Sequence, residues 1–299
     1  MSTVFSIIIP HHNIPGLLRR CLDSVPRRDD TEVLVVDDGS DAACQRELEH
    51  VAADYPWVRF IMCKECKGGG VARNVGIEQA KGRYLVFADA DDFFNVCIND
   101  VMDDYKNSSY DTIYLKANSV DSVTYETAGR ADHLNRYIEA FLSGKDPEGK
   151  ALRYLFGEPW ARIVSSRLVN DNQIRFDEIK VHNDTTFAYL TGYYSKNIHI
   201  DTREAYCVTV RSKSVSQQVS HERAYIRMRV FGKAEFFLAE RGIGVRPVEH
   251  YHQLLSLLAH GEFRVFVKCV RILRGESCGY YSILTGMCQA LKATVINKL

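Results

Sequence analysis

Three apolar runs in the first hundred residues each end in a short polar segment. The run 5–9 is followed by Pro10-His11-His12-Asn13, the run 32–36 by Asp37-Asp38-Gly39-Ser40, and the run 84–88 by Asp89-Ala90-Asp91-Asp92. If these runs are neighbouring strands of one parallel sheet, the polar segments meet at its carboxyl edge, where such sheets bind ligands. Carboxylates brought together there repel one another unless a cation or hydrogen-bond donors lie between them. A divalent metal ion with a nucleoside diphosphate would satisfy this requirement.

The spacing of Asp89 and Asp91 suits a shared ligand. In extended backbone, two residues separated by one position point to the same side, so both carboxylates can face one ion. Ligation by oxygen alone favours Mg²⁺ or Mn²⁺, with phosphate oxygens as the remaining ligands. Taken alone, this acidic turn is more typical of the solvated end of a strand, so the metal hypothesis depends on the other segments.

A glycine-rich segment, 67–70, precedes a stretch with helical spacing. Backbone amides at the start of a helix can receive negative charge, so this segment suits phosphate oxygens. It has neither the dinucleotide-binding spacing nor the Gly-Lys-Ser/Thr ending of a P-loop, which argues against a dehydrogenase and a P-loop kinase. Arg73 is the expected cation for phosphate or for the acidic segments. The alternative is an arginine on the surface of the helix.

Apolar runs and amphipathic stretches alternate through the first hundred residues, as they do in βαβ units around a mainly parallel sheet. The predicted strands are 5–9, which Pro10 ends, 32–36, 58–62, 84–88 and 112–116; the predicted helices are 14–25, 42–55, 71–80 and 133–142. After about residue 222 the pattern is strongly helical. The sequence thus predicts an α/β fold with a helical C-terminal extension.

Four segments together resemble the family 2 glycosyltransferases of the GT-A fold. They are Ser6-Ile7-Ile8-Ile9-Pro10, Val35-Val36-Asp37-Asp38-Gly39-Ser40, Gly69-Gly70-Val71-Ala72-Arg73-Asn74-Val75-Gly76 and Phe87-Ala88-Asp89-Ala90-Asp91-Asp92. Each is weak alone, but their order and spacing are specific. The resemblance implies a GT-A domain with a nucleotide-sugar half over 1–100 and an acceptor half over 101–220, followed by a helical region over 221–299.

The resemblance also implies roles on the donor side. Asp91, with Asp89 or with Asp92, would hold Mn²⁺ or Mg²⁺, and Asp89 would face the ribose. Pro10 with Asp37 or Asp38 would hold the base and ribose, and the glycine loop with Arg73 would lie near the uracil or the phosphates. The predicted donor-binding residues are Pro10, Asn13, Asp37, Asp38, Gly69, Gly70, Arg73, Asp89, Ala90 and Arg211.

The segment 182–187 resembles the acceptor side of the family, where an acidic pair supplies the catalytic base. Asn183 stands at the position of the first acid, so Asp184 is the predicted base, and Asn183 would lie beside the acceptor. Trp160 would form an apolar wall for a sugar ring, although a single tryptophan is as often a core residue. The stretch 211–216 resembles the Arg-x-x-Ser-x-Ser that closes the catalytic region in bacterial members, so Arg211 could reach the diphosphate.

This family transfers a sugar from a nucleoside diphosphate, here expected to be UDP, to an acceptor hydroxyl with inversion. Asp184 would take the proton of the attacking hydroxyl, while the metal and cationic side chains would stabilise the leaving diphosphate. The alternative is a non-catalytic relative that binds nucleotide sugar as a partner subunit, which Asn183 favours. A nucleotidyltransferase needs a loop rich in lysine and arginine after the first strand, and the residues after Pro10 lack one.

The composition excludes some classes of function. The 299 residues include 38 Lys and Arg and 38 Asp and Glu, which gives no electrostatic case for a nucleic-acid partner. The nine cysteines are odd in number and scattered, and no signal-peptide pattern opens the chain, so we expect a reducing, cytoplasmic location. Cys63 and Cys66 are more typical of an incidental pair of thiols than of a zinc or redox site.

Basic residues outnumber acidic ones from residue 262 onward. The cations are Arg264, Lys268, Arg271, Arg274, Lys292 and Lys298, and the acids are Glu262 and Glu276. Aromatic and aliphatic residues interleave with these cations, which predicts amphipathic basic helices. Such helices can lie on the anionic inner face of the plasma membrane. The alternative is that they pack on the catalytic domain or on a second subunit in a homodimer. By family analogy, a membrane-surface site fits a glycan or lipid-linked glycan acceptor in bacterial cell-surface polysaccharide assembly.

Overall fold

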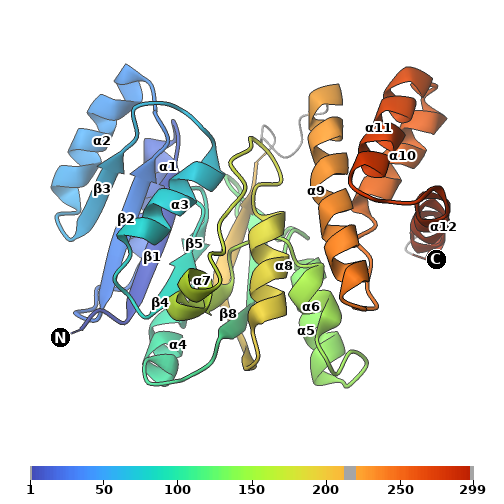
Figure 1. The fold of residues 1–299 in the computed structure, drawn as a ribbon. Helices are drawn as coiled ribbons and strands as arrows, with labels where there is room; N and C mark the ends of the chain where they lie inside the picture. The colour runs from blue at the N-terminus through green and yellow to red at the C-terminus, as the bar shows by residue number, and fades with distance from the viewer. Residues whose placement is uncertain (1, 212–219, 297–299) are drawn as a thin grey trace. The chain divides into compact units, whose positions relative to one another are not determined.

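The computed structural model describes residues 2–211 and 220–296 (Figure 1). It divides into two compact units, Met1–Ser214 and Val215–Leu299, which we call the N-terminal and the C-terminal unit. Lys298 and most of the Arg-x-x-Ser-x-Ser stretch lie outside the described residues. Each unit is described by itself.

The N-terminal unit is built on an eight-stranded sheet in the order β3-β2-β1-β4-β7-β6-β8-β5. The strands are β1 (Phe5–His11), β2 (Thr31–Asp37), β3 (Val58–Met62), β4 (Tyr84–Phe87), β5 (Phe93–Phe94), β6 (Thr112–Asp121), β7 (Arg162–Ser165) and β8 (Ile198–Val210). Strands β1 to β4 pair in parallel, as do β6 and β8, whereas β7 and β5 pair antiparallel to their neighbours. The predicted mainly parallel α/β sheet is confirmed. The long strand β8 is absent from the sequence prediction.

Helices cover both faces of this sheet, and its central strands β1 and β4 are accordingly buried along nearly their whole length. Ile7 and Ile9 pack into a core with α1, α2, α4, α5 and α6, while Ile8 points the other way, into a core with α3, α7 and α8. Strands buried on both faces read as continuous apolar runs. The helices are α1 (Pro15–Ser24), α2 (Ala42–Asp54), α3 (Gly69–Gln79), α4 (Ile98–Tyr105), α5 (Asp132–Leu142), α6 (Lys150–Tyr154), α7 (Ser166–Asp171) and α8 (Thr185–Tyr194).

Pro10 lies within β1 and does not end it, which corrects the predicted boundary. The amide of Ala88 donates to the carbonyl of Ile8, so Ile8 and, two positions on, Pro10 turn their backbone polar groups toward β4. Strand β4 ends at Phe87. An amide at position 10 would therefore point to a place where β4 has already ended. Proline, which has no amide hydrogen, costs no hydrogen bond between strands there, and β1 continues to His11.

The described part of the C-terminal unit, residues 220–296, forms four helices around its own core. They are α9 (His221–Glu240), α10 (Glu249–Ala259), α11 (Phe263–Gly275) and α12 (Tyr280–Ile296). One acid, Glu235, is buried in this unit and accepts hydrogen bonds from Tyr251 at 2.6 Å and Ser282 at 2.5 Å. Within the described residues, every helix falls short of the length and apolarity needed to cross a bilayer.

Candidate active site

The polar segments predicted to meet do so at the carboxyl edge of the sheet. Strands β1, β2 and β4 run in parallel, and His11 at the end of β1 is in register with Asp37 at the end of β2. Asp38 follows β2 directly, and Asp89 lies two residues beyond β4. Since parallel strands end at the same edge, these side chains share one region of the surface.

Asp37 is a buried residue that connects the end of β1 to the turn after β2. Its side chain is fully buried and accepts hydrogen bonds from His11 Nδ1 at 2.8 Å and from the Ser40 amide at 2.9 Å. Burial lowers the pKa of His11, although Asp37 opposes that shift, so the imidazole is neutral near pH 7. Asp37 therefore holds the turn at Gly39 and has no exposed surface to offer a ligand, which corrects its predicted place among the donor contacts.

Asp38 fastens the glycine loop to the end of β2. Its two carboxylate oxygens accept from the amides of Lys67 at 2.9 Å and Gly68 at 2.8 Å. Nearby, Asn13 is exposed, has a positive φ of 55°, and accepts from the amide of Asp41 at 2.9 Å. Pro10 and Asn13 thus border the same edge as the loop that opens α3.

Glycine at position 70 permits the close approach of α3 to the acceptor-side segment. A Cβ atom there would lie 2.2 Å from the carbonyl oxygen of Asp177 and 2.9 Å from Cβ of Asn183. Real Cβ atoms do not come so close to backbone, so an alanine would force the two segments apart. At Gly69 the nearest atom to a Cβ would be Nη1 of Arg73, at 3.2 Å.

Arg73 joins the donor side to the predicted catalytic segment. Its side chain is nearly buried, with Nη2 2.5 Å from Asp89 Oδ1 and Nη1 3.2 Å from Asn183 Oδ1. The guanidinium also lies over the ring of Phe176, at 5.3 Å from the centroid. The alternative of a surface arginine is thereby excluded, and segments more than a hundred residues apart in the chain meet at one cation.

The acidic turn 89–92 is anchored through Asp92. Tyr206 on β8 donates to Asp92 Oδ2 at 2.9 Å, the amide of Thr209 donates to Oδ1 at 2.7 Å, and the Tyr206 hydroxyl accepts from the amide of Asp89 at 2.9 Å. Burial, followed by the charges of Asp91 and Asp89, raises the pKa of Asp92 well above its ordinary value. Both oxygens of Asp92 are engaged, so it is an anchor for the turn.

Asp89 and Asp91 remain as the carboxylates that could hold a cation. Oxygens of Asp89, Asp91 and Asp92 lie within 4.8 Å of one another, and Ala90 between the first two is buried in the core. The two carboxylates are therefore close, but the predicted extended backbone is wrong: residues 89–92 form a turn in which the amide of Asp92 donates to the carbonyl of Asp89 at 3.0 Å. Ala90 itself has no exposed side chain for a donor contact. Burial and the charge of Asp89 raise the pKa of Asp91, and its ion pair with Arg211 opposes that rise.

Asp184 lies directly before α8, adjacent to the Arg73 contact. Burial, then the negative charge of Glu158, raise the pKa of Asp184 to about 6, while Arg73 opposes the rise. Burial alone would raise the pKa of Glu158 as well, but a hydrogen bond from His133 at 3.2 Å and an ion pair with Arg130 at 2.9 Å hold it at about 2. The two acids thus differ in proton affinity, and Asp184 is the one suited to accept a proton near neutral pH.

Trp160 does not form a wall for a sugar ring. It is 2% exposed and stacks on Tyr206 with ring centroids 5.8 Å apart, while Phe156 packs against its edge at 5.1 Å. The indole therefore packs against Tyr206, the residue that anchors the acidic turn. This corrects the predicted acceptor contact in favour of the core alternative.

Two contributors to the site carry no sequence motif. Arg20 on α1 donates to the backbone carbonyl of Asp91 at 2.5 Å and to that of Ser122 at 2.9 Å, and so orients the acidic turn. Tyr206 anchors the same turn from β8. Only the pairing of β8 with β5 and β6 brings it there, so no local pattern could have identified it.

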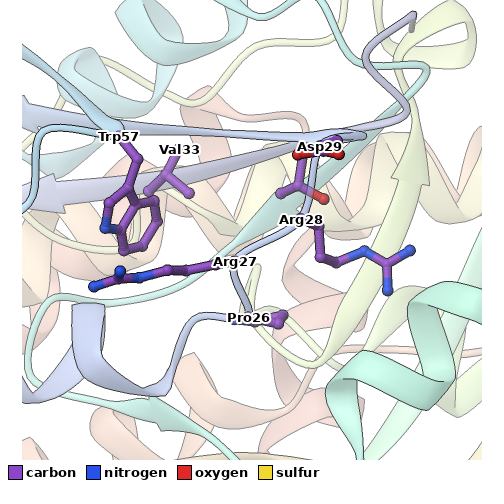
Figure 2. A pocket seen from close by; sticks show the side chains of 7 residues that line it. Pro26, Arg27, Arg28, Asp29, Val33 and Trp57 are labelled. Carbon is purple, nitrogen blue, oxygen red and sulfur yellow. The ribbon is translucent and has the colours of Figure 1, made fainter.

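A pocket at the opposite edge of the sheet is separate from this site. It has a volume of about 290 Å³ and lies at the start of β2, lined by the loop 26–29 with Thr31, Val33 and Trp57 (Figure 2). Arg27 covers the indole of Trp57 there, at 5.5 Å from the ring centroid. Because the carboxyl ends of β1, β2 and β4 point away from it, this pocket is not the predicted nucleotide crevice.

Curated relatives are bacterial glycosyltransferases. The chain is 26% identical over 241 residues to the poly(ribitol-phosphate) beta-N-acetylglucosaminyltransferase TarS of Staphylococcus aureus, covering 76% of this chain and 39% of that protein. It is 23% identical over 276 residues to the glycosyltransferase GlyA of Streptococcus pneumoniae, covering 86% and 38%. A shorter match, 38% identical over 89 residues, is to the uncharacterized glycosyltransferase YibD of Escherichia coli, covering 29% and 26%. The chain thus spans well under half the length of these three relatives.

Solved structures show the same fold. The crystal structure of S. aureus TarS 1–349 in complex with UDP-GlcNAc superposes with a TM-score of 0.58 at 22% identity, covering 78% of this chain and 66% of that one. The same fragment with UDP gives 0.55 at 17% identity, covering 92% and 90%. The model of the family described as "Glycosyl transferase family 2" matches residues 6–162, more than half of the chain. With the acids of β2 and β4 gathered at one edge of a GT-A sheet, the chain belongs to glycosyl transferase family 2.

Proposed function

We propose that this chain transfers a sugar from a UDP-sugar to an acceptor hydroxyl with inversion at the anomeric carbon. The observation that carries the proposal is the double contact of Arg73, which links Asp89 on the donor side to Asn183, the neighbour of Asp184. This contact supports a site in which Asp184 is the proton acceptor and Arg73 is a cation for the diphosphate. The match to bacterial enzymes, TarS among them, supports an acceptor in cell-surface polysaccharide assembly.

In this proposal Asp184 removes the proton of the attacking hydroxyl. Its raised pKa, about 6, makes it a stronger base than an exposed aspartate while leaving it mostly ionised at pH 7. Arg73 and the amides at the start of α3 attract the phosphates. We assign Arg211, whose side chain pairs with Asp91, a second contact to the departing diphosphate.

The residues present fit a divalent cation. Asp89 and Asp91 offer hard oxygen ligands within 4.8 Å of each other, and Asp92 is engaged elsewhere. This donor set favours Mn²⁺ or Mg²⁺. When bound, such an ion supplies Lewis-acid stabilisation of the leaving diphosphate.

The test is UDP release from a panel of UDP-sugars by the purified full chain, with and without Mn²⁺, where water takes the place of the acceptor hydroxyl and the sugar is released as the free sugar. UDP-GlcNAc is the first donor to try, because the similar TarS fragment was solved with it. We expect metal-dependent release that Asp184→Asn reduces by roughly 10²–10⁴-fold while nucleotide affinity is kept. Binding of a UDP-sugar with no release of UDP by the wild type would instead support the non-catalytic alternative that Asn183 favours.

A further inference from the structure

Helix α12 exposes an ordered stripe of apolar side chains. Tyr280, Tyr281, Leu284 and Leu291 are 65, 82, 63 and 51% exposed. At about 100° per residue, these positions fall within roughly 100° of arc on one face of the helix. The opposite side of α12 packs into the core of the C-terminal unit through Ile283 and Ala290. An exposed apolar stripe of this length is typical of a surface that meets a partner.

Helix α11 adds basic side chains and two further apolar ones. Phe263 and Val267 are 63 and 44% exposed, and helical spacing places Arg264, Arg271 and Arg274 on the same face. The guanidinium of Arg274 lies over the ring of Tyr280, at 4.5 Å from its centroid, so the two helices meet here. We call these side chains, with Lys292 of α12 and the four α12 residues above, the basic-aromatic face.

The charge of this face is uncompensated in the part of the chain that the structure describes. Helices α11 and α12 contain no acidic residue. The nearest acids in sequence are engaged elsewhere, Glu262 with His221 at 2.6 Å and Glu276 with Arg229 at 3.6 Å. The partner of this face must therefore bring negative charge together with an apolar layer. A second copy of the chain would oppose like charges across a two-fold interface.

We propose that the basic-aromatic face docks this chain on the surface of an anionic lipid bilayer. Tyrosines favour the boundary between headgroups and acyl chains, and leucine and phenylalanine can enter the outer acyl region. Arginine and lysine extend along that boundary toward lipid phosphates and are attracted by the negative surface potential. The contact is peripheral and reversible.

Sedimentation with vesicles tests the proposal on the full chain without any nucleotide sugar, so its outcome is independent of the proposed sugar transfer. We expect binding to vesicles of phosphatidylcholine with phosphatidylglycerol, little binding to phosphatidylcholine alone, and weaker binding at high salt. Two double variants, Tyr281→Asp with Leu284→Asp and Arg264→Glu with Arg271→Glu, should each lower the partition coefficient at least roughly tenfold.

Val96→Asp and Val123→Asp are the matched controls, because these valines are 95 and 83% exposed on the N-terminal unit. They should sediment like the wild type, and circular dichroism melts should show that all variants fold. Equal sedimentation of the wild type and both double variants would overturn the proposal. So would salt-independent binding to neutral vesicles, or a dimer that the apolar double variant dissociates without any change in lipid binding.

Discussion

Replacing Asp184 by asparagine should stabilise the fold while removing transfer. The carboxyl of Asp184 has a pKa of about 6 in the folded chain, against an ordinary value of 3.8. Because the folded pKa is raised, the folded state favours the protonated form, and ionising Asp184 costs folding free energy. Asparagine resembles the protonated acid in shape and has no charge, so the variant avoids that cost.

The magnitude follows from the difference between the pKa of about 6 in the folded chain and the ordinary value of 3.8. At about 1.4 kcal/mol per unit, the ionised carboxylate destabilises the fold by at most about 3 kcal/mol. Since the side chain is only partly shielded from water, we expect roughly 1–2 kcal/mol. The penalty is absent below pH 3.8, develops between pH 3.8 and about 6, and is complete above pH 6. The variant should therefore match the wild type near pH 4 and exceed it at pH 7.5.

Thermal melts at the two pH values, paired with the UDP-release assay, measure both effects. One kcal/mol corresponds to roughly 2–4 °C in a domain of this size, so the variant should melt roughly 2–8 °C higher at pH 7.5. The matched control is Asp171→Asn, because the Asp171 side chain is 62% exposed and pairs with Arg167 on the same helix. The melting temperature of this variant should change little. An Asp184→Asn protein that melts lower than wild type at pH 7.5, or that still releases UDP at a comparable rate, would refute the reasoning.

Three further changes test the donor side. Asp91→Ala should weaken UDP binding in the presence of Mn²⁺ far more than in its absence, which titration calorimetry measures; equal loss in both would remove Asp91 as a metal ligand. Gly70→Ala should lower stability by roughly 1–3 kcal/mol because its Cβ would lie 2.2 Å from a backbone oxygen, whereas Gly16→Ala, with open space around it, should be neutral in the same denaturant titration. Tyr206→Phe should cost roughly 1–3 kcal/mol by leaving buried Asp92 short of a donor, and an unchanged unfolding free energy would contradict its anchoring role.

The donor half could be predicted from sequence because its information is local. Each strand there is a mainly apolar run, interrupted by Ser6 in β1 and by Arg59 in β3, and the predicted strand 58–62 coincides with β3. Each polar segment lies at the end of its strand or within two residues of it, so a parallel sheet is enough to bring Asp38, Asp89 and Asp91 to one edge. Even Arg73 could be assigned, because it follows the glycine loop at helical spacing.

The part of the sheet beyond β4, formed by β7, β6, β8 and β5, depends on pairing between residues far apart in the sequence, which a local sequence pattern does not reveal. Strand β8 has 13 residues, and its exposed and buried positions do not alternate regularly along its length. Its register with β6 shifts around Lys116, and that register decides that Tyr206 faces Asp92. The prediction that Trp160 contacts a sugar is wrong for the same reason, since its stacking on Tyr206 exists only once β8 is in place.

The asparagine at position 183 is compatible with catalysis on electrostatic grounds. Asp184 already has a raised pKa because of burial and the nearby charge of Glu158. A second carboxylate beside it, as the family pattern would have, adds repulsion that raises this pKa further unless Arg73 neutralises it fully. Asn183 accepts the hydrogen bond of Arg73 without adding charge, so the guanidinium remains available to Asp89 and to phosphate. An asparagine at this position therefore keeps the contact with Arg73 and leaves Asp184, the base in the proposed mechanism, mostly ionised at neutral pH.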